Sequence, residues 1–148
     1  MPENKDTKPD FKPPDPSTLV SPWPLGTTAT IRALAWPDYS SPKELEHVLS
    51  VAEPLFGRND SCLCLRHDPS VDIPLDDAIA AIEQALTNHP SSKDLNILII
   101  DDKIDRSDWP RVGLSAFCAI QSEASGKGQR AEFINAQKVE IVSIAINI

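Results

Sequence analysis

Residues 95–100 constrain the fold more than any other stretch. All of them except Asn96 are leucine or isoleucine, and the run stops on Asp101 and Asp102. A continuous apolar run of this length favours a strand covered on both faces, which is typical of a parallel sheet flanked by helices. The acidic stop suits the carboxyl end of such a strand, where open α/β sheets bind ligands. We therefore expect residues 95–101 to form the central strand of the fold.

Strand-like and helix-like patterns alternate along the rest of the chain. Apolar runs predict strands at 30–36, 61–66, 95–101, 116–120 and 140–146. Apolar residues at three- and four-residue spacing predict helices at 42–56, 74–86 and 130–136, with Gly57 as a left-handed stop after the first. Ser107 can cap a further short helix. Such alternation implies right-handed crossovers, so we expect a doubly wound, mainly parallel five-stranded sheet of the Rossmann-like α/β class.

Prolines concentrate near the amino terminus, where residues 1–26 hold seven of the fourteen. Proline removes backbone donors and blocks helix formation, and the remaining residues there are mostly polar or charged. We expect residues 1–26 to form a disordered tail and residues 27–148 to form one domain. Residues 1–18 lack the apolar stretch of a signal peptide, and no run approaches the roughly 20 apolar residues of a membrane span.

Charge and side-chain chemistry narrow the function classes. The formal net charge of −8 argues against a nucleic-acid or anionic-membrane surface, which needs clustered lysine and arginine. The three cysteines follow no paired ligand spacing, which favours buried thiols, a reducing compartment and a cytoplasmic protein. The three histidines are scattered, so a zinc site is not expected.

Three positions carry a candidate role beside a plainer interpretation. His67, next to Asp68, has the chemistry of a general base, although a lone loop histidine is more often structural. His47 is expected on the exposed side of the first helix, without a role. Asp101 and Asp102 can bind Mg²⁺ as hard oxygen ligands, or they can form a solvated strand end.

Residues 125–128 read Ser-Gly-Lys-Gly and lie just before a predicted helix. This loop lacks the full pattern of the phosphate-binding loop of nucleotide hydrolases. Its glycines can still bring backbone donors to an anion at the helix start, with Lys127 or Arg130 adding positive charge. An ordinary connecting loop is the alternative.

The segments 117–128 and 131–142, with the order of the elements and the Asp-Trp-Pro of residues 108–110, resemble the carboxyl-terminal lobe of two-lobed (GT-B type) glycosyltransferases. Residues 35–39, followed by a helix, also look like segments of bacterial glycosyltransferase-like proteins. In that family the loop and helix start receive the diphosphate of a nucleotide sugar, and a glutamate at the position of Glu132 holds the ribose. The chain departs from the family at Ala124, where a glutamate is usual, and at Gln137, where a glycine is usual.

The resemblance implies a nucleotide-sugar site and no further cofactor. The implied site residues are Ser125, Gly126, Lys127, Gly128, Arg130, Glu132 and Arg66. Residues 1–26 cannot form an acceptor lobe, so the expected function is a glycosyltransferase-like domain, a reduced donor-binding lobe that is incomplete as an enzyme and whose catalytic residues are unknown. Two alternatives stay open. One is a non-catalytic interaction module that binds a protein partner or a second copy, and the other is a small-ligand regulatory domain using Asp101 and Asp102.

Overall fold

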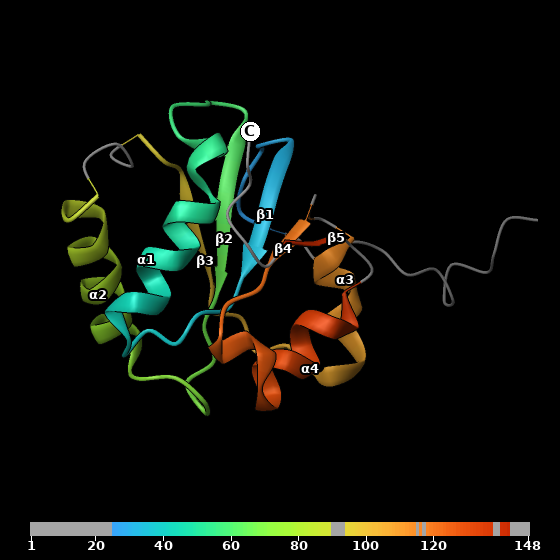
Figure 1. Cartoon of the computed structure of the whole chain (residues 1–148). Coiled ribbons are helices and arrows are strands. Elements are labelled where there is room, and N and C mark those ends of the chain that lie inside the picture. Colours follow the sequence, from blue (N-terminus) through green and yellow to red (C-terminus); the bar gives the residue numbers. More distant parts are fainter. Residues whose placement is uncertain (1–24, 90–93, 115, 117, 138–139, 143–148) are drawn as a thin grey trace, which may run out of the picture.

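The structure is a computed structural model, and it describes residues 25–89, 94–114, 116, 118–137 and 140–142. The tail predicted at residues 1–26 therefore lies almost wholly outside the described residues. Strands and helices alternate along the chain (Figure 1). In the part of the chain that is described, no helix has the length and apolar character needed to cross a membrane.

The sheet lies in the middle of the molecule with its strands in the order β3-β2-β1-β4-β5, and every neighbouring pair is parallel. The predicted class, an α/β fold with a parallel sheet flanked by helices, is confirmed. The prediction that residues 95–101 form the central strand is wrong, because β3 is an edge strand and β1 is central. A continuous apolar run indicates that both faces of a strand are covered. It does not indicate whether that strand is central or at the edge of the sheet. The strands are β1 (Ile31–Ala35), β2 (Ser61–Arg66), β3 (Ile97–Ile100), β4 (Cys118–Ile120) and β5 (Glu140–Val142).

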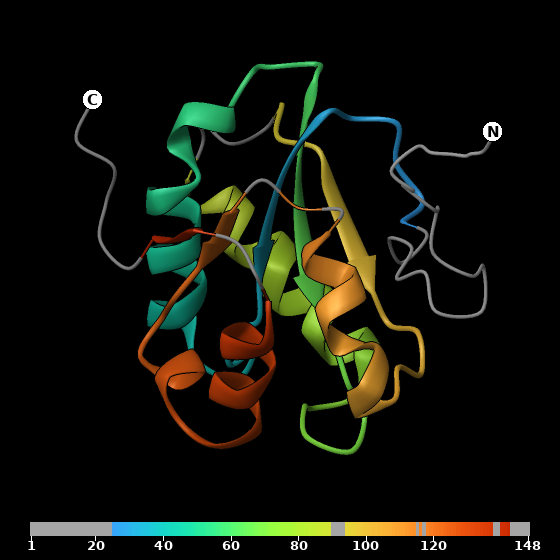
Figure 2. The ribbon, with the colours of Figure 1, turned by 90° about the vertical axis from the view of Figure 1, so that its right-hand side faces the viewer.

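Helices cover both faces of the sheet, and Figure 2 shows α1 and α3 on opposite sides of it. Side chains of α1 and α2, among them Leu45 and Ile82, lie over Leu63 and Leu65 of β2. On the other face, Phe133 of α4 packs against Trp36, which directly follows β1, and against Trp109 of α3. The α-helices are α1 (Pro42–Val51), α2 (Leu75–Thr87), α3 (Trp109–Gly113) and α4 (Gly128–Ala136), and the 3-10 turns are η2 (Glu53–Leu55), η4 (Arg106–Asp108) and η5 (Ala124–Gly126).

Local sequence signals set both ends of α1. Ser41 caps its start, since its Oγ accepts a hydrogen bond from the backbone N of Glu44 at 3.4 Å, and Pro42 occupies the first helical position as predicted. The helix ends at Val51, earlier than the predicted residue 56. Pro54 has no N–H to continue the hydrogen-bond ladder, so the chain goes on as the short turn η2.

Gly57 adopts a φ of +74°, in the left-handed region that the sequence predicted. A Cβ added at this position meets no atom within 4 Å, so the cost of alanine there is backbone strain alone. We expect Gly57→Ala to lower the free energy of unfolding by about 1–2 kcal/mol in urea denaturation. Gly126→Ala is the matched control, because Gly126 is not left-handed and its added Cβ lies 4.0 Å from the Nε2 of Gln121. Equal losses in the two variants contradict the strain argument.

Candidate ligand-binding crevice

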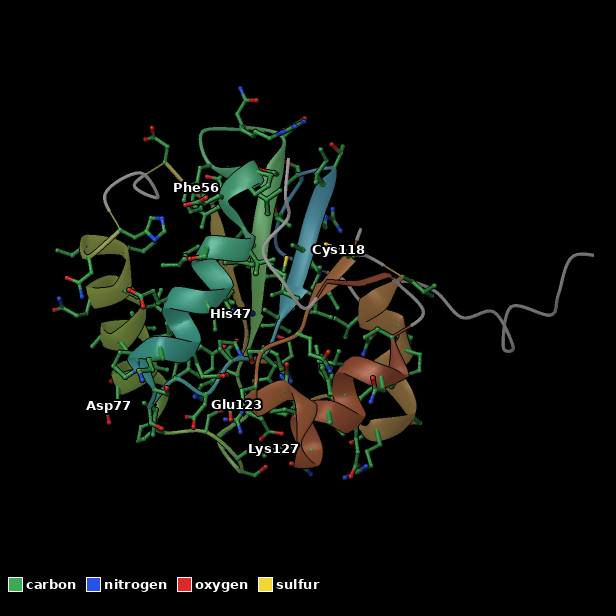
Figure 3. All side chains as sticks on the ribbon, viewed as in Figure 1. His47, Phe56, Asp77, Cys118, Glu123 and Lys127 are labelled. Carbon is green, nitrogen blue, oxygen red and sulfur yellow. The ribbon has the colours of Figure 1, made fainter. Side chains whose placement is uncertain are left out.

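The strand order reverses between β1 and β4, because the chain places β2 and β3 on one side of β1 and then crosses to place β4 and β5 on the other. Open α/β sheets bind ligands outside the carboxyl ends of the strands at such a reversal. The structure has a hollow of about 440 Å³ at this place, which we call the switch-point crevice. Its lining comes from the start of α1 and from the segment after β4, on which Figure 3 labels His47 and Glu123. The lining residues are Ser41, Lys43, Glu44, His47, Gln121, Ser122 and Glu123.

Glu44 is the charged residue buried most deeply in this lining, with 9% of its surface exposed. Its Oε1 accepts hydrogen bonds from the backbone N of Asp38 at 3.1 Å and from the hydroxyl of Ser122 at 2.7 Å. Its Oε2 accepts a hydrogen bond from the backbone N of Ala124 at 3.1 Å. One carboxylate therefore joins the loop after β1 to the loop after β4. Glu44 was not among the residues predicted to form a site.

His47 and Lys43 supply the basic groups of the switch-point crevice. The Nε2 of His47 lies 3.1 Å from the carbonyl oxygen of Gln121, and this nitrogen carries a proton because a carbonyl only accepts. His47 is half-buried, so the expectation that it lies on the exposed side of the helix is wrong. Lys43 is exposed, and no ion-pair partner for it exists among the residues that the structure describes.

A buried guanidinium cluster, formed by Trp36, Arg66, Asp72 and Arg130, lies on the α4 side of the same sheet edge. The side chain of Asp72 is 0% exposed, and it accepts hydrogen bonds from the Nε1 of Trp36 at 2.8 Å and from the Nη2 of Arg130. The guanidinium carbons of Arg66 and Arg130 lie 5.8 Å and 5.6 Å from the centre of the Trp36 ring, within the range of a cation–π contact. The charged groups and the indole N–H of this cluster therefore interact with other groups of the same chain.

Arg66 joins the ends of two strands inside that cluster. It is 2% exposed, and its Nη1 donates to the carbonyl oxygens of Ile100 at 3.0 Å and Asp102 at 2.6 Å. Burial lowers the pKa of the Arg66 guanidinium, although nearby carboxylates, first that of Asp68, oppose this shift. The Tyr39 hydroxyl donates to the carbonyl of Arg66, and burial raises the pKa of that phenol well above its usual value. Arg66 is therefore engaged within the chain.

The loop of residues 125–128, which was predicted to hold a diphosphate, also makes contacts within the chain. Ser125 is buried, and its Oγ accepts a hydrogen bond from the backbone N of Ser122 at 2.7 Å. Gly126 is exposed. Lys127 is exposed as well, and its Nζ lies 3.8 Å from the Oε2 of Glu123. The side chains of Ser125 and Lys127 therefore contact different partners.

The remaining residues implied by the resemblance lie further along α4. Gly128 begins the helix with a φ of +60°. The exposed carboxylate of Glu132 accepts a hydrogen bond from the Nη1 of Arg106, which also lies over the ring of Trp109. Arg130 belongs to the buried guanidinium cluster. The structure therefore brings Arg66 and Arg130 together on Trp36 and leaves Glu132 apart from them.

A second hollow, of about 360 Å³, lies over the carboxyl ends of β2 and β3. Asp101, Asp102 and Lys103 contribute to its lining, and all three are exposed. Within the described part of the chain, no group of three or more side chains is placed to hold a metal ion. Binding of Mg²⁺ by the two aspartates stays a prediction.

His67 takes the structural position that the plainer interpretation predicted. It is 1% exposed, and its Nε2 donates to the carbonyl of Ile73 at 2.7 Å. Its Nδ1 has no hydrogen-bond partner among the described residues. A histidine enclosed in this way does not reach a ligand in the switch-point crevice.

The three cysteines form no disulfide within the part of the chain that the structure describes. Cys62 and Cys64 are buried, and Cys118 is half-buried. A hydrogen bond from Cys64 lowers the pKa of the Cys62 thiol to about 7, whereas the same contact and burial raise the pKa of Cys64 above its usual value. The expectation of buried thiols is thus confirmed for two of the three.

Comparisons with known proteins give a fold neighbour and no family. No family model matches the chain, and no curated protein does. A solved structure of a universal stress protein in complex with cAMP matches it with a TM-score of 0.51 and 11% sequence identity. The match covers 80% of this chain and 100% of that one. At this level of identity the likeness shows the α/β fold alone.

Proposed function

We propose that this chain is a small-ligand-binding α/β domain that binds a nucleotide in the switch-point crevice. The observation that carries the proposal is the position of the 440 Å³ polar hollow at the reversal of strand order, where open α/β sheets bind their ligands. This proposal retains the small-ligand hypothesis that the sequence suggested. It places the ligand in the crevice beside α1 instead of at Asp101 and Asp102.

The side chains of the crevice match the groups of a nucleotide. The ammonium of Lys43 is exposed at the start of α1, where the helix dipole also favours an anion such as a phosphate. The carboxylate of Glu123 and the amide of Gln121 are suited to accept hydrogen bonds from ribose hydroxyls. The fold neighbour supports the choice of ligand class, because its structure is a complex with cAMP.

Nucleotides are expected to raise the thermal midpoint of the native protein. A ligand that binds only the folded state adds about 2.7 kcal/mol of stability at 100 times its dissociation constant. A panel of cyclic and linear nucleotides, with nucleotide sugars beside them, identifies the base and the phosphate pattern. Absence of a shift with every member contradicts the proposal.

Lys43→Ala is expected to weaken the responding nucleotide by about 10- to 100-fold, since a hydrogen bond to a charged group contributes roughly 1.5–3 kcal/mol. Isothermal titration calorimetry measures the change. Lys103→Ala is the matched control, because Lys103 is also exposed and lies in the hollow over β2 and β3. Equal affinities of the two variants place the ligand outside the switch-point crevice.

The glycosyltransferase-like function stays a prediction, and the same panel tests it. It requires Glu132 and Arg130 as ligands, and their contacts with Arg106 and Asp72 give it no support. A response confined to nucleotide sugars, lost in Glu132→Ala and kept in Lys43→Ala, favours the donor-lobe hypothesis over our proposal.

The interaction module likewise stays a prediction. Among the described residues, the large hydrophobic side chains that are exposed are Ile79 and Leu114. Ile79 lies on α2 and Leu114 directly follows α3, so they lie on opposite sides of the sheet and form no common patch. Light scattering of the free protein tests self-association directly.

A further inference from the structure

The carboxylate of Glu44 occupies a site built from three hydrogen-bond donors. Two are backbone N–H groups, of Asp38 and Ala124, each 3.1 Å from a carboxylate oxygen. The third is the hydroxyl of Ser122 at 2.7 Å. The donors engage both oxygens of a side chain that is nine-tenths buried, which is how an oxyanion is held in a protein.

These donors belong to the two loops that flank the reversal of strand order. Asp38 follows β1 and Ala124 follows β4, so their N–H groups lie at the edge of the sheet where open α/β folds bind ligands. In the described part of the chain, no lysine or arginine forms an ion pair with Glu44. The negative charge is therefore stabilised by hydrogen bonds and by the dipole of α1, in whose first turn Glu44 lies.

We propose that the three donors around Glu44 form an oxyanion site, that the Glu44 carboxylate is its built-in occupant, and that phosphate binds there only when this side chain is removed. The proposal rests on the contacts of Glu44 and not on the nucleotide proposed above. In the native protein the site is filled, so free phosphate has no access to it. When the side chain is removed, the three donors remain at the edge of the switch-point crevice and bind phosphate in its place.

Glu44→Ala tests the proposal, with inorganic phosphate as the probe and chloride at equal ionic strength as the reference. Phosphate at ten times its dissociation constant is expected to raise the folding equilibrium constant of this variant about 11-fold, seen as a raised thermal midpoint. The native protein and Glu44→Gln, whose amide keeps the volume of the side chain, are expected to show no phosphate-specific rise. They also report any general stabilisation of proteins by phosphate as a salt.

The donor set is tested by the double variant Glu44→Ala/Ser122→Ala. Loss of the Ser122 hydroxyl is expected to weaken phosphate at least tenfold relative to Glu44→Ala. A folded Glu44→Ala protein without a phosphate response overturns the proposal, and so does an equal response of Glu44→Gln. In either of these cases the role of Glu44 is structural, and its carboxylate only connects the two loops by hydrogen bonds.

Glu44→Ala can also prove too unstable to fold in phosphate-free buffer, and this outcome is decisive as well. Phosphate that binds only the folded state shifts the equilibrium towards it by mass action. Recovery of the far-ultraviolet circular dichroism in phosphate and not in chloride supports the proposal, and failure to recover overturns it. Nucleotide binding by the native protein is measured separately, so the two proposals fail independently.

Discussion

Asp72→Asn is expected to lower the free energy of unfolding by about 3–5 kcal/mol, the usual cost of leaving one partner of a buried ion pair without its counter-charge. The side chain of Asp72 is 0% exposed and faces the guanidinium of Arg130, whose side chain is 15% exposed. It also accepts hydrogen bonds from the Nε1 of Trp36 at 2.8 Å and from the backbone N of Asp68 at 2.9 Å. The carboxylate thus connects the residue after β1, α4 and the loop before α2.

Urea denaturation followed by circular dichroism measures this loss. Asp60→Asn is the matched control, because Asp60 pairs with Arg58 on the surface, where an ion pair contributes at most about 1 kcal/mol. The double variant Asp72→Asn/Arg130→Met is expected to lose less than the two single losses together, since it removes both charges. A loss below about 1 kcal/mol in Asp72→Asn contradicts the structural role assigned to this carboxylate.

Phe133→Ala is expected to lower the free energy of unfolding by about 3–5 kcal/mol through the cavity that it leaves. The ring is 0% exposed and lies between two indoles. Its centroid is 5.3 Å from that of Trp36 at an interplanar angle of 89°, and 5.5 Å from that of Trp109 at 76°. Edge-to-face pairs of this kind add to the burial term.

Denaturant unfolding monitored by tryptophan fluorescence is well suited to this variant, because both indoles report on the missing ring. Phe56→Ala serves as the control, since Phe56 is half-buried and its edge-to-face contact is with His89. We expect Phe56→Ala to cost clearly less than Phe133→Ala. Equal losses are the result that counts against the aromatic core on the α4 face.

Local patterns predicted the elements of this fold well where the signal is confined to neighbouring residues. The strand at 61–66 has the predicted bounds, and α1 begins at Pro42 as expected. Signals that depend on packing were less reliable. Ile79 is an apolar residue of α2 and is nevertheless 37% exposed, while the neighbouring Ala78 is buried. Helical spacing gives an apolar face only to within about one residue, and the sheet decides which side of that face is covered.

The crevice could be predicted only in part. The sequence placed acidic residues and a glycine-containing loop at the carboxyl ends of strands, and the switch-point crevice lies at this edge of the sheet. It also contained one unused signal for Glu44, which follows the capping residue Ser41 by three positions as in a capping box. That pattern predicts a contact with the backbone of Ser41 itself. The structure directs the carboxylate to Asp38 and to the loop after β4 instead.

The sequence by itself determined the α/β class and the alternation of the elements, and it predicted polar residues at the carboxyl ends of the strands. These properties follow from apolar periodicity, caps and turn residues, which act over a few positions. Only the tertiary structure decided which polar groups meet. Arg130 reaches Asp72 across 58 positions, and Ser122 reaches Glu44 across 78. Such contacts are set by the order of the strands, and strand order is fixed by the packing of the whole sheet rather than by any local segment.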